Sequence, residues 1–246
     1  MAVMRCEVWW ARPDADVTGL IGWLDDHERE RHANYRRDND KLRFLTGRTL
    51  IRMVAGEWLG IAPERVVLDA SCYDCGKPHG KPRVVADGAP EVSISHSGDR
   101  VVLAATDGPP VGIDVEELRE TEVDSLAATV FSAAELHAFR ALPAGERKGA
   151  FFTYWARKEA VVKTTGRGMS VPMSKLTLSP PGVPPTLLES TASEVDAALV
   201  HLLDLDAGPD YRASVAVLSA TAPGTDWVTE HDANLAIAEH LSRQGS

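Results

Sequence analysis

The sequence has few cysteines and no long apolar run. Its three cysteines, an odd number among 246 residues, do not form a disulfide framework and are more typical of reduced thiols in the cytosol. No apolar run approaches the roughly 18 residues that span a bilayer. The N-terminal residues lack the basic, apolar and small-residue segments of a signal peptide. We therefore expect a cytoplasmic protein that does not bind a membrane.

Positive charge is also scarce, and it is unevenly distributed. The net charge of −10 argues against general nucleic-acid binding. From residue 185 onward only Arg212 and Arg243 oppose ten acidic residues, whereas residues 29–52 hold eight basic and three acidic ones. A locally basic stretch in an acidic protein favours a small polyanion as ligand, although a solvated helix face explains it equally well.

Apolar periodicity predicts alternating strands and helices in a chain long enough for one large domain or two small ones. Strands are expected at residues 7–12, 66–68, 91–95, 100–106, 111–116, 174–178, 199–205 and 211–221. Helices are expected at residues 25–37, 39–59, 151–165 and 232–243, and Ser132 with Glu135 forms a capping box. In each half a helix that ends in glycine precedes a Val/Ala-rich strand, which indicates either two related halves or a chance echo.

Two acids lie close together on the strand expected at residues 111–116. Asp114 and Glu116 are two positions apart, so both side chains point to one face of a strand. A cation between them would relieve their mutual repulsion, and carboxylate oxygens suit Mg²⁺. Gly112 would let a ligand or another backbone approach closely. Two solvated acids at an exposed strand end are the alternative, and for this pattern alone they are favoured.

A second charged group lies on the helix expected at residues 151–165. Glu159 and Lys163 are four positions apart and share one helix face, as an ordinary surface ion pair would. The largely apolar surroundings count against idle surface charges. Glu159 could complete a magnesium site or act as a base, while Lys158 and Lys163 could neutralise phosphate.

Hydroxyl and cationic side chains occur in two further segments. Ser95 and His96, at a strand end, could be a nucleophile and base, a phosphate site, or parts of a structural hairpin. Lys81 and Arg83 place two cations on a tight loop stiffened by Pro82, which would suit a phosphate clamp.

The loop before Lys81 contains three possible zinc ligands. Cys72, Cys75 and His79 have suitable chemistry, but the usual second pair of ligands is missing. A plain loop with reduced thiols is the favoured alternative.

The order of the motifs along the chain is more specific than any one of them. The chain reads GKP at 80–82, ISHSG at 94–98, VGIDVE at 111–116, FSAAE at 131–135, WARKEAVVK at 155–163 and GRG at 166–168. This order resembles the 4′-phosphopantetheinyl transferases of the larger, surfactin-synthetase-activating (Sfp) type. The resemblance covers about residues 25–178 and, more loosely, the whole chain.

The resemblance implies both a fold and an activity. The fold would be an α+β pseudo-dimer of two similar subdomains, each with a small, mostly antiparallel sheet packed on a long helix. Residues 1–108 would form the nucleotide side, and residues 109–246 the metal and catalytic side with a peripheral C-terminal helix. The activity would be that of a magnesium-dependent holo-carrier-protein synthase. It would move the phosphopantetheine arm of coenzyme A onto a serine of a carrier protein and release 3′,5′-ADP.

The resemblance also implies residue roles. Asp114, Glu116 and Glu159 would hold Mg²⁺, and Glu159 and Lys163 would be catalytic. Coenzyme A would be bound by Arg43, Arg48, Lys81, Ser95, His96, Asp114, Lys158 and Lys163. Arg31 is a weaker candidate, and at Glu28 some relatives carry a lysine used on coenzyme A, which puts that contact in doubt.

Partners and rival activities remain open at this point. The apo carrier protein could belong to fatty-acid, polyketide or nonribosomal peptide synthesis, and its docking would use local cations or apolar contacts after Val115 and before Trp155. The protein is expected to be a monomer. A module that binds coenzyme A or a carrier without transfer, and a hydrolase of the coenzyme A pyrophosphate, are the alternatives.

Overall fold

The computed structural model describes residues 5–13 and 15–244. The helices are α1 (Asp26–Asn34), α2 (Asp38–Leu59), α3 (Val123–Val130), α4 (Ala133–Ala141), α5 (Ala144–Thr164) and α6 (Ala233–Gln244). The strands are β1 (Cys6–Ala11), β2 (Leu68–Asp69), β3 (Arg83–Val84), β4 (Glu91–Ser97), β5 (Arg100–Thr106), β6 (Val111–Glu117), β7 (Leu176–Leu178), β8 (Leu187–Ser190), β9 (Val200–Leu205), β10 (Tyr211–Leu218) and β11 (Val228–Asp232). Short 3₁₀ segments include η1 (Ala15–Trp23) and η3 (Gly168–Ser170).

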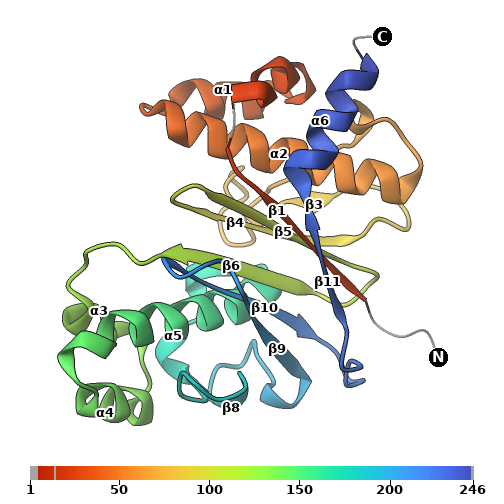
Figure 1. Ribbon diagram of the computed structural model, residues 1–246. Coiled ribbons are helices and arrows are strands. Elements are labelled where there is room, and N and C mark those ends of the chain that lie inside the picture. Colours follow the sequence, from red (N-terminus) through yellow and green to blue (C-terminus); the bar gives the residue numbers. More distant parts are fainter. Residues whose placement is uncertain (1–4, 14, 245–246) are drawn as a thin grey trace.

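Two sheets stack between two long helices (Figure 1). The first sheet has the strand order β11-β1-β5-β4 and the second has β6-β10-β9, and their pairs are antiparallel except for β1 with β11. α2 packs on the first sheet and α5 on the second. The predicted α+β fold, with two similar halves that each set a small sheet on a long helix, is confirmed.

The core continues through both faces of β5. Val102 and Ala104 pack toward the second sheet, whereas Val101 and Leu103 pack toward α2. Because neither face meets water, the strand is an uninterrupted apolar run and not an alternation of apolar and polar residues. This burial explains why its bounds could be predicted closely.

Both long helices end at a glycine in the left-handed region. Gly60 has a φ of 65° after α2, and Gly166 has a φ of 67° after α5. Such a conformation costs glycine little, so these residues end the helices as predicted. α5 begins at Ala144, seven residues before the predicted start at residue 151. The sequence pattern did not indicate these first turns because they carry few apolar residues and no side-chain cap.

The C-terminal segment returns to the first half. β11 pairs in parallel with β1, and Ile237 of α6 is buried in a cluster with Val17, Leu20 and Phe44. The helix expected to be peripheral therefore contributes to the packing of α2 and η1.

The division of the chain at residues 108 and 109 stays a prediction. Among the described residues, no helix has the length and apolar character that a membrane crossing requires.

Candidate functional site

A row of serines joins the two sheets where β4 lies beside β6. Ser93 and Ser97 each accept a hydrogen bond from a backbone amide of β6 at 3.1 Å. The Ser95 hydroxyl donates to Oδ1 of Asp114 at 2.7 Å, and the Ser97 hydroxyl donates to Oε2 of Glu116 at 3.3 Å. The alternate residues of β4 thus fix both the backbone of β6 and the two acids that it presents.

A glycine lets α5 lie unusually close to β6. A Cβ atom at Gly112 would stand 1.9 Å from the carbonyl oxygen of Ala160 in α5. The predicted close approach to Gly112 is therefore made by another backbone. Because strand residues alternate, Asp114 and Glu116 share the face of Gly112, and α5 brings Glu159 and Lys163 to that face.

Asp114 and Lys163 form an ion pair at the centre of this contact. Lys163 Nζ lies 2.7 Å from Asp114 Oδ1 and also donates to the carbonyl of Ile113 at 3.0 Å. Asp114 is 3% exposed, and its Oδ2 has no hydrogen-bond partner among the described residues. A buried carboxylate oxygen without a donor is costly, so this atom is a ready acceptor for a cation.

The two other carboxylates carry raised pKa values. Burial raises the pKa of Glu116 to about 7, and repulsion from Asp114 adds to this. Burial also raises the pKa of Glu159, where Lys163 opposes the effect and Asp114 reinforces it. Asp114 is thus close enough to repel each of the other two carboxylates. The three carboxylates do not form a compact ligand set, because in the described part of the chain only Cys72, Cys75 and His79 bring three candidate ligand atoms within 4.8 Å of one another.

Positive charges crowd the same region. Lys81 donates to the carbonyl of Val111 at 2.7 Å; burial lowers its pKa to about 8, and Lys163 acts in the same direction. The pKa of His96 is lowered by desolvation and then by the nearby Lys163 and Arg43. Glu91 opposes the shift at Lys81, so burial is the main cause there. Several cations near one another favour an anionic ligand between them.

A cavity of about 440 Å³ opens beside this group. Its walls include Lys81, Ser93, Glu159 and Lys163, together with residues of the loop at 70–82. The predicted residues Asp114, Glu116, Glu159, Lys163, Lys81 and Ser95, with His96 and Arg43 at the edge, are therefore brought together by β4, β6, α5 and the loop.

Lys158 is not brought into this group. It is fully buried, its Nζ lies 2.7 Å from Oε2 of Glu135, and it also donates to the carbonyls of Met173 and Leu176. An ammonium group whose donors all point at internal acceptors has none left for a phosphate. The arrangement gives Lys158 a role in packing α5 against α4 and the segment before β7.

Arg48 also lies apart from the carboxylates. It pairs with Glu28 at 3.1 Å, and Arg52 pairs with the same carboxylate at 2.6 Å. Burial lowers the pKa of Arg48. Arg48, Glu28 and Arg31 line a separate cavity of about 660 Å³ that shares His79 with the first. Glu28, where some relatives carry a lysine, thus neutralises two arginines of α2.

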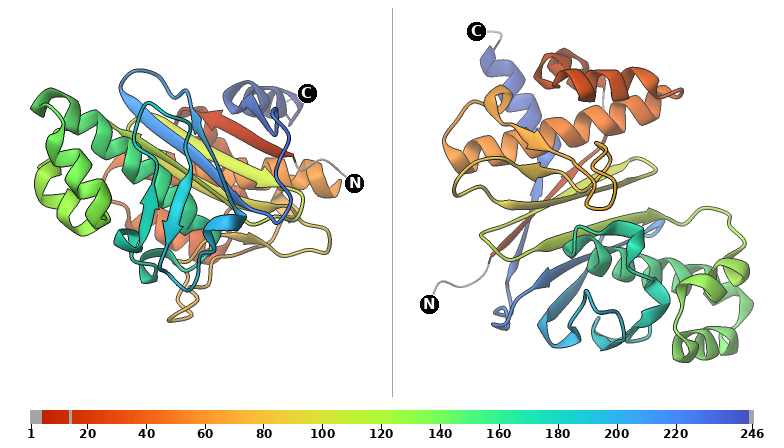
Figure 2. Two further views of the ribbon diagram at one scale, coloured as in Figure 1. Left: turned by 90° about the horizontal axis from the view of Figure 1, so that it is seen from below. Right: turned by 180° about the vertical axis from the view of Figure 1, so that it is seen from behind.

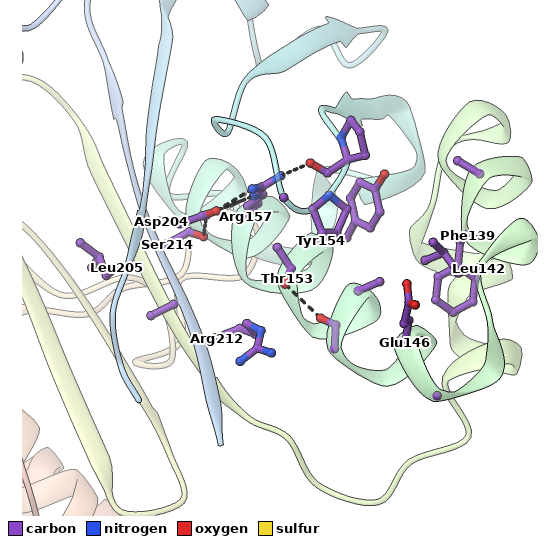
Figure 3. A pocket seen from close by; sticks show the side chains of 18 residues that line it. Phe139, Leu142, Glu146, Thr153, Tyr154, Arg157, Asp204, Leu205, Arg212 and Ser214 are labelled. Carbon is purple, nitrogen blue, oxygen red and sulfur yellow. Dashed lines mark hydrogen bonds and ion pairs between the residues drawn. The ribbon is translucent and has the colours of Figure 1, made fainter. Parts of the chain in front are cut away.

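A cavity of about 620 Å³ lies on another face of α5 (Figure 3). Arg157 reaches across it to Asp204, with Nη2 2.5 Å from Oδ2, and donates to the carbonyl of Ser179 at 2.8 Å. These bonds satisfy the buried guanidinium and tie α5 to β9. The cavity lacks the predicted site residues, so it is not part of the group around Asp114.

Sequence reasoning left two contributors to the group without a role. They are Ser93 and Ser97, whose bonds to β6 connect residues about 20 positions apart and so lie beyond any local pattern. The period of two from Ser93 to Ser97 is the signal that could have indicated one hydroxyl-bearing face.

Two family descriptions match the chain in succession. Residues 110–216 match the family described as 4′-phosphopantetheinyl transferase superfamily, and residues 8–108 match the one described as 4′-phosphopantetheinyl transferase, N-terminal. The boundary between the matches falls in the turn between β5 and β6, immediately before the strand that carries Asp114.

Several curated proteins are similar to this chain. The 4′-phosphopantetheinyl transferase HetI of Nostoc sp. is 32% identical over 65% of this chain and 66% of its own length. The 4′-phosphopantetheinyl transferase psf-1 of Bacillus pumilus is 36% identical over 56% of each chain. The phosphopantetheinyl transferase of Thraustochytrium sp. is 30% identical over 82% of this chain and 68% of its own. The matched part thus spans less than two thirds of the first two relatives. The predicted family is confirmed, and the chain belongs to the 4′-phosphopantetheinyl transferase superfamily.

Proposed function

We propose that this protein transfers the 4′-phosphopantetheine group of coenzyme A to a serine hydroxyl of an apo carrier protein and releases 3′,5′-ADP. The observation that carries the proposal is the group on β6 and α5, where Asp114, Glu116 and Glu159 surround Lys163 beside a cavity lined by Lys81. Phosphoryl transfer needs cations at the phosphates and a base at the nucleophile, and this group supplies both.

The carboxylates fit a hard divalent cation such as Mg²⁺. Asp114 Oδ2 is buried without a donor among the described residues, and burial, reinforced by repulsion from Asp114, raises the pKa values of Glu116 and Glu159. Oxygen ligands are those that Mg²⁺ prefers. When bound, the ion would neutralise charge on the pyrophosphate. Asp114, Glu116 and Glu159 are the residues proposed to hold it.

Glu159 is the proposed acceptor of the serine proton. Burial makes its carboxylate a stronger base than an exposed one, and Lys163 one helical turn away keeps a cation beside it. The serine oxygen would attack the phosphorus bonded to pantetheine as its proton passes to Glu159, directly or through water. The bond to the leaving 3′,5′-ADP oxygen would break in the same step.

The cations of this region are proposed to bind the phosphates. Lys163 and Lys81 would face the pyrophosphate at the cavity, whereas His96 and Arg43 would take the 3′-phosphate. Burial lowers the pKa values of Lys81 and His96, and an anionic phosphate beside them would favour their protonated forms. Lys158, held by Glu135, is left out of this assignment.

The proposal is tested by a carrier protein of increased mass. The protein, coenzyme A, Mg²⁺ and a panel of apo carriers from fatty-acid, polyketide and nonribosomal peptide synthesis are expected to give a carrier heavier by one phosphopantetheine group. Intact-protein mass spectrometry measures this. No mass gain with any carrier that an active control transferase modifies would refute the proposal. Free phosphopantetheine formed without carrier would instead indicate a hydrolase, and coenzyme A binding without turnover a binding module.

Metal affinity should depend on pH near neutrality. Because the pKa of Glu116 is raised to about 7, a cation that binds its carboxylate must displace a proton below that pH. Affinity for Mg²⁺ is therefore expected to increase up to about tenfold per pH unit as pH rises toward 7, and to level off above it. Calorimetry at about pH 6 and about pH 8, in buffers of different ionisation enthalpy, measures both affinity and proton release. Equal affinities would contradict the assignment. Glu116→Gln should reduce the dependence on pH, and the remainder would come from Glu159, whose pKa is also raised.

The carrier surface and the cellular setting rest on the sequence alone. A protein with a net charge of −10 does not attract acidic carriers globally, so docking would use local cations or apolar contacts between Val115 and Trp155. That the protein acts as a cytoplasmic monomer also stays a prediction.

A further inference from the structure

The loop at residues 70–82 gathers two thiols and an imidazole that the proposed reaction does not use. One ligand atom each from Cys72, Cys75 and His79 lies within 4.8 Å of the other two. Cys75 Sγ and His79 Nε2 are 3.0 Å apart. These residues project from the tip of the short β2–β3 ribbon, where Cys75 and His79 are exposed and Cys72 is half-buried.

The backbone holds these side chains in a defined turn. The amide of Gly76 donates to the Cys72 carbonyl at 2.9 Å, and the amide of Cys72 donates to the carbonyl of Lys77 at 2.8 Å. Gly76 has a φ of 68°, which reverses the chain after Cys75. At the base of the loop the Gly80 amide donates to the carbonyl of Ala70 at 2.7 Å. The ligands are therefore set by local hydrogen bonds, and a metal would find them largely preorganised.

The donor set selects the kind of metal. Two thiolates and an imidazole are soft or borderline ligands, which suit Zn²⁺ and not Mg²⁺. Bond lengths of about 2.3 Å to sulfur and about 2.0 Å to nitrogen place tetrahedral ligand atoms roughly 3.5 to 3.8 Å apart. The observed spacing reaches this with small side-chain rotations. The exposed side of the site leaves a fourth position for water.

The loop also connects the two halves of the protein. Arg167 stacks over the Tyr73 ring at 4.3 Å and donates to its hydroxyl at 3.3 Å. Ser170 of η3 donates to Asp74 at 3.0 Å. In the right-hand view of Figure 2 the loop hangs from the first half toward the second. Tyr73 and Asp74 lie between the two cysteines, so a metal that fixes the cysteines also fixes both contacts.

We propose that Cys72, Cys75 and His79 bind one Zn²⁺ ion, which holds the loop at 70–82 against the segment at 167–170. The ion is separate from the Mg²⁺ proposed at Asp114, and its ligands differ in chemical class. The loop leads directly into Lys81, so the ion would also support the wall of the cavity beside Glu159 and Lys163. The binding of Zn²⁺ itself does not depend on the proposed transferase activity.

Cys6 offers a matched control for the two loop cysteines. It is buried in β1, and burial raises the pKa of its thiol to about 12, so it remains protonated and inaccessible to a metal. Cys6→Ala removes a thiol elsewhere in the fold, whereas Cys72→Ser and His79→Gln each remove one proposed ligand.

Cobalt spectroscopy with zinc displacement tests the proposal. The whole protein, stripped with a chelator and kept under a non-thiol reductant, is titrated with Co²⁺ and then with Zn²⁺. We expect one equivalent of Co²⁺ to give tetrahedral d–d bands with thiolate charge transfer, and Zn²⁺ to displace it. Loss of an outer-shell partner alone costs about 10- to 100-fold in affinity, so Cys72→Ser and His79→Gln should each lose at least about 100-fold. Cys6→Ala should bind like the wild type.

Three results would overturn the proposal. They are a wild-type protein without thiolate bands, bands that persist in both Cys72→Ser and His79→Gln, and bands that vanish in Cys6→Ala while its circular dichroism is native.

Hydrogen exchange separately tests the proposed brace, that is, the holding of the loop at 70–82 against the segment at 167–170. Removal of Zn²⁺ is expected to speed amide exchange at residues 70–82 and 167–170 and to leave α2 unchanged. Unchanged exchange in the loop would refute the brace.

Discussion

Replacing Glu159 with glutamine is expected to slow phosphopantetheine transfer by roughly 10³-fold or more while the protein stays folded. Glutamine keeps the size of the side chain but neither accepts the serine proton nor offers a charged ligand to Mg²⁺. The raised pKa of Glu159 means that the fold disfavours its charged form. The neutral variant should therefore be at least as stable as the wild type in metal-free protein near neutral pH. Initial rates from carrier mass and a thermal melt measure the two effects.

A control on the same helix separates the site from the helix itself. Glu146 is exposed in the first turn of α5, so Glu146→Gln should leave both rate and melting temperature unchanged. Raising Mg²⁺ distinguishes the two roles of Glu159, because saturating metal would rescue a variant that had lost only a ligand. A Glu159→Gln enzyme within tenfold of the wild-type rate would remove Glu159 from the proposed chemistry.

Local patterns were enough to predict most of the elements around the site. β5 could be bounded closely because both its faces are buried, and α2 because its apolar residues recur at helical spacing and Gly60 ends it. The pairing of β11 with β1 joins residues more than 200 positions apart. No local period encodes such a contact, which depends on how the whole chain closes.

The same limit applies to the site. The spacing of Asp114 and Glu116 on one strand, and of Glu159 and Lys163 on one helix, predicted which side chains share a face. Spacing within one element does not show which side chains of a strand and a helix face each other. That contact depends on Gly112, whose missing side chain lets α5 lie against β6. The sequence indicated a close approach there, and the structure identifies the partner as a helix backbone.

Lys158 shows where a motif is not sufficient. It lies one position before Glu159, and adjacent residues on a helix point about 100° apart, so a helix that presents Glu159 to β6 turns Lys158 elsewhere. The Lys158 side chain is buried there by α4 and by the segment that leads into β7, which both fold against α5. Proximity in sequence to Glu159 therefore did not imply proximity to the group around Asp114.

Among the substitutions discussed, breaking the Glu135–Lys158 pair is expected to lower the free energy of unfolding most. Glu135 accepts hydrogen bonds from the amides of Ser132 and Leu178, both at 2.8 Å, besides pairing with Lys158. Glu135→Ala would leave a buried ammonium and two buried amides without their acceptor. Loss of one partner of a buried pair costs about 3 to 5 kcal/mol, which lowers the melting temperature of a protein of this size by roughly 10 °C.

A double-mutant cycle measures how strongly the two members of this pair are coupled in stability. Lys158→Met removes the charge but leaves Glu135 buried, whereas Glu135→Gln combined with Lys158→Met removes both charges and keeps an acceptor for one of the two amides. The double variant should therefore lose less stability than the single variants Glu135→Gln and Lys158→Met lose together, by at least about 1 kcal/mol. Glu120→Ala, which breaks the exposed pair with Lys148, should leave the unfolding curve unchanged.

The kinetics of the same variants decide what Lys158 does. If its ammonium serves only the packing of α5, the double variant should retain the wild-type KM for coenzyme A at temperatures where it is folded. A lysine that contacts a phosphate would raise KM in Lys158→Met and in the double variant alike, whatever their stability. The structure predicts the first outcome, because each donor of Lys158 already has an internal acceptor in Glu135, Met173 or Leu176.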